Sequence, residues 1–216
     1  MARITVLGGT GYVGSNIVAV AAQRGHTVTS YSRKLPETQV DGVRYEQADV
    51  TNDDVLSSSA AGADVVVSAL SPRGDLEGAG VLCALEQRIA SHTQGAGARL
   101  GVVGGAGSLL VAPGGPRVAD TPEFPAEVKP EADEMDGVLQ DLRASDPALD
   151  WFYISPAGGF GPWAEGAATG EYRTGGDVIL VDEDGQSNIS AADFADAVVT
   201  EIEKPAHRRE RFTVAY

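Results

Sequence analysis

The first residues in the chain with a chemical signature are four closely spaced glycines. Gly8, Gly9, Gly11 and Gly14 fit G-x-G-x-x-G when counted from Gly9, between an apolar run at residues 4–7 and an amphipathic stretch. In a strand–turn–helix, this spacing leaves backbone N–H groups facing an anion at the positive end of a helix. The sequence therefore predicts a corner that binds the pyrophosphate of a dinucleotide, with contacts from Gly8, Thr10, Gly11, Tyr12, Val13 and Gly14.

The end of the second predicted strand indicates which dinucleotide binds. NAD(H) enzymes usually place Asp or Glu there, about 20 residues after the turn, on the ribose hydroxyls. This chain instead reads Ser-Tyr-Ser followed by Arg33 and Lys34. The forked donors of Arg33 suit a 2′-phosphate, which a carboxylate would repel. NADP(H) is therefore favoured over NAD(H), with an ordinary solvated pair of cations as the alternative.

A second polar strand end follows at Asp49 and Val50. These residues are placed to meet the adenine, either through the Asp49 side chain or through the Val50 backbone. An ordinary Asp turn at the end of a strand is the alternative at this point.

A sheet must position these groups, and the pattern of the chain predicts one. The continuous apolar run at residues 65–67 is typical of a strand that is buried on both faces. Alternating strands and helices imply βαβ units with right-handed crossovers. We expect one α/β domain over residues 1–216, a Rossmann-type doubly wound parallel sheet with a small C-terminal substrate lobe formed by insertions. The predicted strands are 4–7, 27–32, 43–47, 64–70, 100–103, 150–155 and 211–215, and the predicted helices are 15–24, 53–59, 78–96, 131–145 and 193–203.

Two stretches rich in Gly and Pro interrupt this rhythm, at residues 104–129 and 157–188. Both follow the C-terminal end of a strand, the edge outside which open α/β sheets bind ligands. We expect them to form the substrate side of the site, with disordered surface loops as the alternative.

The amino-acid composition disfavours some classes of binding partner. The net charge of −15 argues against duplex nucleic acid and anionic membrane surfaces, because both require basic patches. No apolar run approaches the roughly 20 residues of a membrane span, and the N-terminus reads as a strand and not as a signal peptide.

Cys83 is the only cysteine and the three histidines lie far apart, so neither a disulfide nor a metal site is predicted. We expect a cytoplasmic protein with a small-molecule substrate, and the oligomeric state stays open.

Five segments together carry a resemblance to a known family: residues 8–14, 102–109, 150–157, 169–173 and 189–195. The chain resembles the atypical short-chain dehydrogenase/reductase superfamily. Within it, the chain is most similar to the NAD(P)H-binding group whose members are named NADH-flavin reductases, related to NmrA-type proteins and to flavin and biliverdin reductases. The resemblance covers nearly the whole chain.

This resemblance implies where the nicotinamide lies. It places the ring between the ends of the fourth, fifth and sixth predicted strands. Ser108 approximately matches the active-site serine position of related flavin reductases, which makes it the candidate catalytic residue. The implied cofactor contacts are Ala69, Leu70, Ser71, Gly104, Gly105, Pro156, Ala157 and Gly158.

The chain lacks the usual proton donor of short-chain dehydrogenases, a tyrosine with a lysine four residues later. None of its six tyrosines has Lys at i+4, which disfavours ordinary carbonyl reduction. Flavin reduction needs instead two stacked flat rings, exclusion of water and a hydrogen-bond donor near the flavin carbonyls. Ser108 and the backbone N–H groups of residues 104–107 are the candidate donors. Phe160 and Trp163 are the candidate stacking wall, with loop packing as the alternative, and Tyr172 is a further candidate for the substrate pocket.

These residues favour NAD(P)H-dependent reduction of a flavin or a similar planar acceptor. A non-catalytic NmrA-like dinucleotide redox sensor also fits the missing Tyr/Lys pair. An epimerase- or dehydratase-like enzyme is a third reading, and the missing pair counts against it. Two structural roles are also expected: Tyr153 in the core of a strand, and Ser190 as the N-cap of the last helix.

Overall fold

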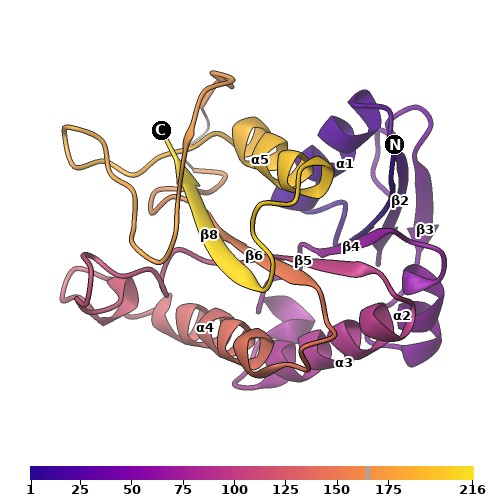
Figure 1. The fold of residues 1–216 in the computed structure, drawn as a ribbon, viewed down its shortest axis with the longest axis horizontal. Coiled ribbons are helices and arrows are strands. Elements are labelled where there is room, and N and C mark those ends of the chain that lie inside the picture. The colour runs from indigo at the N-terminus through magenta and orange to yellow at the C-terminus, as the bar shows by residue number, and fades with distance from the viewer. Residues whose placement is uncertain (164–165) are drawn as a thin grey trace.

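An eight-stranded sheet forms the centre of the protein in a computed structural model, which describes residues 1–163 and 166–216 (Figure 1). The strand order is β3-β2-β1-β4-β5-β6-β8-β7, and every pairing is parallel except that of β7 with β8. The predicted fold class, a Rossmann-type doubly wound α/β sheet, is confirmed. The strands are β1 (Arg3–Leu7), β2 (Thr27–Ser32), β3 (Arg44–Gln47), β4 (Val65–Ser68), β5 (Arg99–Val103), β6 (Trp151–Ser155), β7 (Arg173–Gly175) and β8 (Glu210–Ala215).

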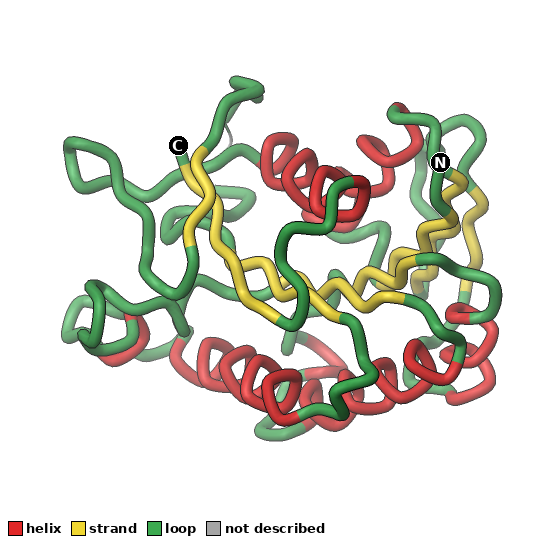
Figure 2. Tube along the Cα trace, in the orientation of Figure 1, coloured by secondary structure: helices red, strands yellow, loops and turns green. Residues whose placement is uncertain are grey.

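Helices cover both faces of the sheet (Figures 1 and 2). Helices α1 (Tyr12–Gln23) and α5 (Ala191–Glu203) pack together on one face, and α2 (Asp53–Ala60), α3 (Val81–Gly95) and α4 (Lys129–Ala144) cover the other. Short 3₁₀ turns lie at Gly74–Leu76 and Val118–Asp120. All four residues of β4 are buried, as the continuous apolar run predicts for a strand covered on both sides.

The order of the strands reverses beside β1. From β1 the chain passes outward through β2 and β3, then returns to pair β4 on the other side of β1. The register aligns Leu7 with Tyr31 of β2 and with Ser68 of β4, so three strands end at one edge. Such a switch point opens a crevice outside the carboxyl ends of the strands, where open α/β sheets bind ligands.

Several local predictions can be compared directly with the structure. Gly25 adopts φ +82°, as expected of the residue that ends α1 in the left-handed region. Ser190 is the N-cap of α5, because its Oγ accepts from the Asp193 backbone N–H at 3.0 Å. Both predictions are confirmed. Helix α1 begins at Tyr12, three residues before the predicted start, because Gly11 is already its N-cap.

Strand β7 was missed, since the sequence predicted only loop over residues 157–188. The structure forms β7 there, at Arg173–Gly175, paired antiparallel to β8 at the edge of the sheet. Three residues are too few to show the alternation that marks a strand in sequence, so long-range pairing decides this element.

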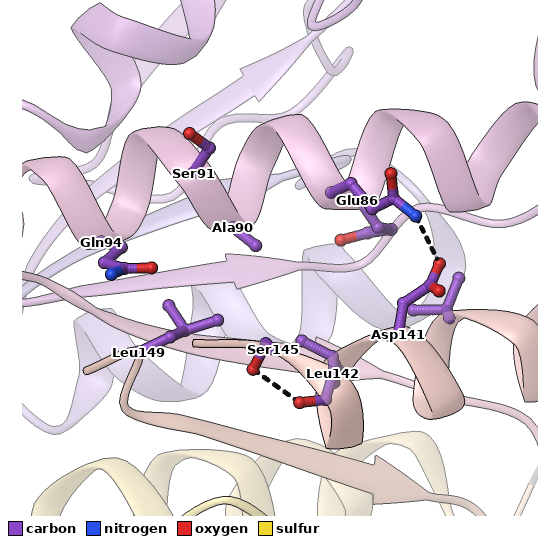
Figure 3. Close-up of a pocket in the computed structure, with 10 residues that line it drawn as sticks. Glu86, Ala90, Ser91, Gln94, Asp141, Leu142, Ser145 and Leu149 are labelled. Carbon is purple, nitrogen blue, oxygen red and sulfur yellow. Dashed lines mark hydrogen bonds between the residues drawn. The ribbon is translucent and has the colours of Figure 1, made fainter. Parts of the chain in front are cut away.

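A hollow of about 260 Å³ lies between α3 and α4, and Glu86 on α3 is one of the residues that line it (Figure 3). Glu86 is 4% exposed, and one of its carboxyl oxygens accepts from the Ser68 hydroxyl. The other oxygen, Oε2, has no hydrogen-bond partner among the residues that the structure describes. Burial raises the pKa of Glu86 to about 7, although the Ser68 hydrogen bond acts in the opposite direction. An apolar interior stabilises the neutral carboxylic acid in this way.

We expect Glu86→Gln to change the pH dependence of stability. Because the folded state keeps the Glu86 proton up to about pH 7, wild type loses stability as the pH rises from the unfolded pKa toward that value. The full cost above pH 7 is about 3 kcal/mol. Glutamine does not ionise, so the stability of the variant relative to wild type should rise between pH 5 and pH 8 in urea unfolding.

Glu77→Gln is the matched control, because Glu77 is an exposed acid on the segment that leads into the same helix. Its effect on stability should be equal at both pH values. A Glu86→Gln difference that does not change between pH 5 and pH 8 would contradict the buried titration.

Candidate functional site

A cleft in two connected parts follows the carboxyl edge of the sheet. The first part, of about 620 Å³, lies outside β1, β2 and β3, and the second, of about 360 Å³, lies outside β4, β5 and β6. Five residues line both parts, so the two volumes form one elongated site. The shared residues are Gly11, Ala69, Leu70, Ser71 and Arg73.

The glycine corner stands where the two parts meet. A Cβ on Gly14 would lie 2.2 Å from the carbonyl oxygen of Gly8, so only glycine lets α1 start this close to the turn. Gly8 itself has φ +81°, in the left-handed region. The turn is fixed further by Ser32, whose Oγ accepts from the Thr10 backbone N–H at 3.1 Å.

The N-terminus of α1 suits an anion. Gly11 is the N-cap and has no side chain to cap the helix, and the first turn carries no acidic residue. An uncapped N-terminus with the dipole directed at a cleft favours a phosphate. The corner therefore fits the pyrophosphate of a dinucleotide.

The far end of the first part carries the polar residues singled out in the sequence. Asp49 accepts from the backbone N–H and the hydroxyl of Thr51 at 2.9 and 2.8 Å. These bonds hold the pKa of Asp49 below its usual value, so the carboxylate stays ionised. Arg33 lines the cleft and forms an ion pair with Asp75, whereas Lys34 is exposed and lies outside the lining.

The second part is enclosed by three strand ends, and Tyr153 fixes one of them. The Tyr153 hydroxyl donates to the carbonyl of Met135 at 3.0 Å and accepts from the Gly105 N–H at 3.3 Å. A Cβ on Gly104 would lie 2.0 Å from the Tyr153 ring. Burial raises the pKa of Tyr153, which keeps it neutral. Tyr153 is fully buried, as predicted for the core of a strand, and it anchors the turn at residues 104–107 to α4.

Aromatic rings form one wall of the second part. Phe160 packs between Tyr12 and Phe194, with ring centroids 5.6 and 4.9 Å away, and the Tyr12 hydroxyl donates to the Gly161 carbonyl at 3.2 Å. Trp163 covers Gly161 and is 72% exposed, so most of the indole is available to a ligand. This wall joins the phosphate corner to the loop after β6.

Ionisable groups are few in the second part. Among the lining residues that the structure describes, they are Tyr12, Arg73 and Glu131. Arg73 and Glu131 form a two-pronged ion pair, with N···O distances of 2.8 and 2.9 Å. The remaining lining is apolar side chains, serine, proline, alanine and glycine backbone. The second part of the cleft, called the chamber below, therefore suits a flat, largely apolar ring system.

The predicted site residues divide into two groups. Most of them line the cleft, but Lys34, Ser108 and Tyr172 lie outside the lining, and Gly14 is buried beneath the corner. Those that line it are Gly8, Thr10, Gly11, Tyr12, Val13, Arg33, Asp49, Val50, Ala69, Leu70, Ser71, Gly104, Gly105, Pro156, Ala157, Gly158, Phe160 and Trp163.

Ser108 is directed away from the cleft. It is 5% exposed, and its Oγ accepts from Nη1 of Arg211 on β8 at 2.9 Å. Arg211 in turn pairs with Asp177 at 2.6 Å. Tyr172 is likewise used elsewhere, since its hydroxyl donates to Asp196 on α5 at 2.9 Å. The expected position of both side chains in the pocket therefore needs correction, because Arg211 on β8 holds Ser108 and Asp196 on α5 holds Tyr172 outside the lining.

The structure also brings to the cleft residues that the sequence did not indicate. Arg73 lies five residues after the end of β4, and its position just past a strand end was a usable signal. Glu131 and Met135 lie on α4 and reach the cleft only because that helix packs beside the turn that follows β5. No local pattern distinguishes them from other residues of an amphipathic helix.

Within residues 1–163 and 166–216, no group of three or more His, Cys, Asp or Glu side chains could hold a metal ion. Nor is any helix there long and apolar enough to cross a membrane.

Residues 8–205 match the family profile described as NAD(P)H-binding. The chain belongs to this family, which supports a nicotinamide dinucleotide as its cofactor. The glycine corner and the uncapped N-terminus of α1 fit such a group.

Three solved structures share the fold over nearly their full length. A Burkholderia pseudomallei protein provisionally described as exported is 39% identical, with TM-score 0.86 and complete coverage of both chains. A Bacteroides thetaiotaomicron protein provisionally named an epimerase is 34% identical, with TM-score 0.88 and coverage of 100% and 97%. A Streptococcus pneumoniae protein provisionally named an NADH-flavin reductase is 31% identical, with TM-score 0.84 and coverage of 100% and 99%. The cellular location stays a prediction.

Substitutions in the glycine corner should separate binding from folding. In Gly11→Ala the new Cβ meets the Gly8 carbonyl oxygen at 3.3 Å and the backbone φ is −73°, so the fold should persist. Gly11 lines both parts of the cleft, so the added methyl group should lower the affinity for NADPH about tenfold or more. Gly14→Ala should also lower the melting temperature by several degrees, because its Cβ would overlap backbone.

Gly95→Ala serves as the control, because its Cβ would enter open space at the end of α3. It should leave NADPH affinity unchanged in a fluorescence titration. Wild-type affinity in Gly11→Ala would show that the pyrophosphate binds elsewhere.

Proposed function

We propose that the protein is an NADP(H)-dependent reductase that transfers a hydride to a flavin or a similarly planar acceptor. The observation that carries this proposal is the second part of the cleft, an apolar chamber with an aromatic wall directly beside the glycine corner. The first part of the cleft would hold the adenosine, and the N-terminus of α1 would hold the pyrophosphate. Residues 69–71, 104–105 and 156–158 would hold the nicotinamide.

The chain's own residues hold the two reacting rings and exclude water from between them. Bound in the second part, the nicotinamide supplies a hydride to a stacked acceptor. Phe160 and Trp163 form one wall, and Met135 lies on α4 near the turn at residues 104–107. Tyr153 holds that turn by accepting from the Gly105 N–H, and the Gly104 N–H donates to the Ile154 carbonyl. The backbone N–H groups of Ala106 and Gly107 are therefore the candidate donors to the acceptor carbonyls. Positioning of this kind supplies much of the rate of a hydride transfer.

The missing Tyr/Lys pair is consistent with this chemistry. A flavin delocalises the negative charge it receives over its ring system, so reduction needs no side-chain acid within the chamber. Arg73 and Glu131 neutralise each other at the rim and leave the interior apolar. Ser108 acts indirectly, through the Arg211 network that holds β8, and not at the reacting atoms.

A redox sensor of the NmrA type is the second candidate function. The observation that favours it is the same shortage of ionisable groups in the chamber. A sensor and a reductase differ in turnover, because a sensor binds the dinucleotide without passing electrons to a small acceptor.

Turnover with flavins tests the reductase proposal. NADPH oxidation should rise well above background with FMN, FAD or riboflavin. Trp163→Ala should raise the KM for the flavin about fivefold or more through loss of stacking, and Trp163→Phe should restore most of it. Val181→Ala is the control, since Val181 is an exposed apolar residue outside the cleft. If NADPH binds but no flavin raises turnover, the sensor function replaces the reductase.

Binding of the two dinucleotides tests the proposed NADP(H) preference. Arg33→Gln should weaken NADPH about tenfold or more and leave NADH nearly unchanged, since a hydrogen bond between two charged groups contributes about 1.5–3 kcal/mol. Lys34→Gln, with the same loss of charge outside the cleft lining, should have a smaller effect. Equilibrium titration with each nucleotide gives the ratio. An equal loss for NADPH and NADH in Arg33→Gln would contradict a 2′-phosphate contact.

A further inference from the structure

A short segment after β4 lines the cleft and forms two ion pairs with other parts of the chain. We call residues 71–77 the strap. Most of the strap lines the first part of the cleft, through Ser71, Arg73, Gly74, Asp75 and Leu76, and Pro72 lines the second part. Arg73 of the strap pairs with Glu131 on α4, and Asp75 pairs with Arg33 at the end of β2. The strap is therefore tied to both sides of the cleft.

The charges around Arg33 are closely balanced. The charged side chains that line the first part, among the residues described, are Arg33, Arg73, Asp49 and Asp75. Because Arg73 is occupied by Glu131 outside this set, Arg33 is the cation left to two carboxylates. Its charge acts on Asp49, where it adds to the effect of the Thr51 hydrogen bonds in lowering the pKa.

We propose that Asp75 is a specificity-determining residue, which moderates the preference for NADP(H) by competing with the 2′-phosphate for Arg33. This inference rests on the proposed role of Arg33 in binding that phosphate. NADP(H) must displace Asp75 from the guanidinium and then leaves its carboxylate beside a phosphate of like charge. NAD(H) carries no 2′-phosphate and leaves the Arg33–Asp75 pair intact, so Asp75 acts on one nucleotide and not the other.

The solvent exposure of the Arg33–Asp75 ion pair determines how strongly Asp75 lowers the affinity for NADP(H). The Arg33 and Asp75 side chains are 64% and 83% exposed, so water and salt screen their attraction. A phosphate with two negative charges and several acceptor oxygens is the stronger partner for a guanidinium. Asp75 therefore lowers the affinity for NADP(H) without abolishing it.

Asp75→Asn tests the competition in equilibrium titrations of NADPH and NADH. The variant should bind NADPH about two- to fivefold more tightly than wild type, with NADH affinity nearly unchanged. Glu77→Gln is the matched control, because it removes the same charge two residues away and Glu77 lies outside the cleft lining. A gain in Glu77→Gln equal to that in Asp75→Asn would overturn the proposal, since net charge alone would explain both.

The double variant Arg33→Gln/Asp75→Asn separates competition from direct repulsion. Without Arg33, most of the gain in NADPH affinity from Asp75→Asn should disappear, and an undiminished gain would overturn the competition. Failure of the proposed NADP(H) preference looks different, because Arg33→Gln alone would then leave NADPH affinity unchanged. Both readouts are binding constants, so they do not depend on which acceptor is reduced.

Discussion

The close approach of α1 to the first turn is the contact on which the site depends. With no side chain at Gly14, the helix starts against the Gly8 carbonyl, at a distance that any Cβ would prevent. The helix N-terminus is thereby placed at the switch point between β1 and β4, uncapped and directed at the cleft. The positive end of its dipole gives an acidic chain a local site for phosphate.

The second part of the cleft depends on a different restraint, the buried Tyr153. Its ring occupies the space that a Gly104 side chain would need, and its hydroxyl joins the Gly105 amide to the Met135 carbonyl. One polar side chain in the core thus fixes the relative positions of β5, β6 and α4. The chamber so formed is rigid on this side and aromatic on the other, which suits the stacking of flat rings more than proton transfer to a carbonyl.

The two arginines that line the cleft are both ion-paired, which bears on the specificity for phosphate-bearing ligands. Arg33 and Arg73 both have carboxylate partners, one on the strap and one on α4. In the competition that we propose, a ligand phosphate at Arg33 replaces the Asp75 carboxylate instead of filling a vacant positive site. Selectivity is then a difference between two competing partners of one arginine, to which a carboxylate of the protein contributes.

The sequence by itself determined the fold class and the glycine corner. Its apolar runs and glycine spacing act over a few residues, so their physical consequences are local. Strand ends at Asp49, Ala69 and Gly104 could be placed at one edge because parallel strands share that edge. Only the tertiary structure decided the direction of Ser108 toward Arg211, the pairing of β7, and the arrival of Glu131 and Asp75 at the cleft. Each of these depends on a partner that is 38 or more residues away in the chain, and no local pattern encodes that distance.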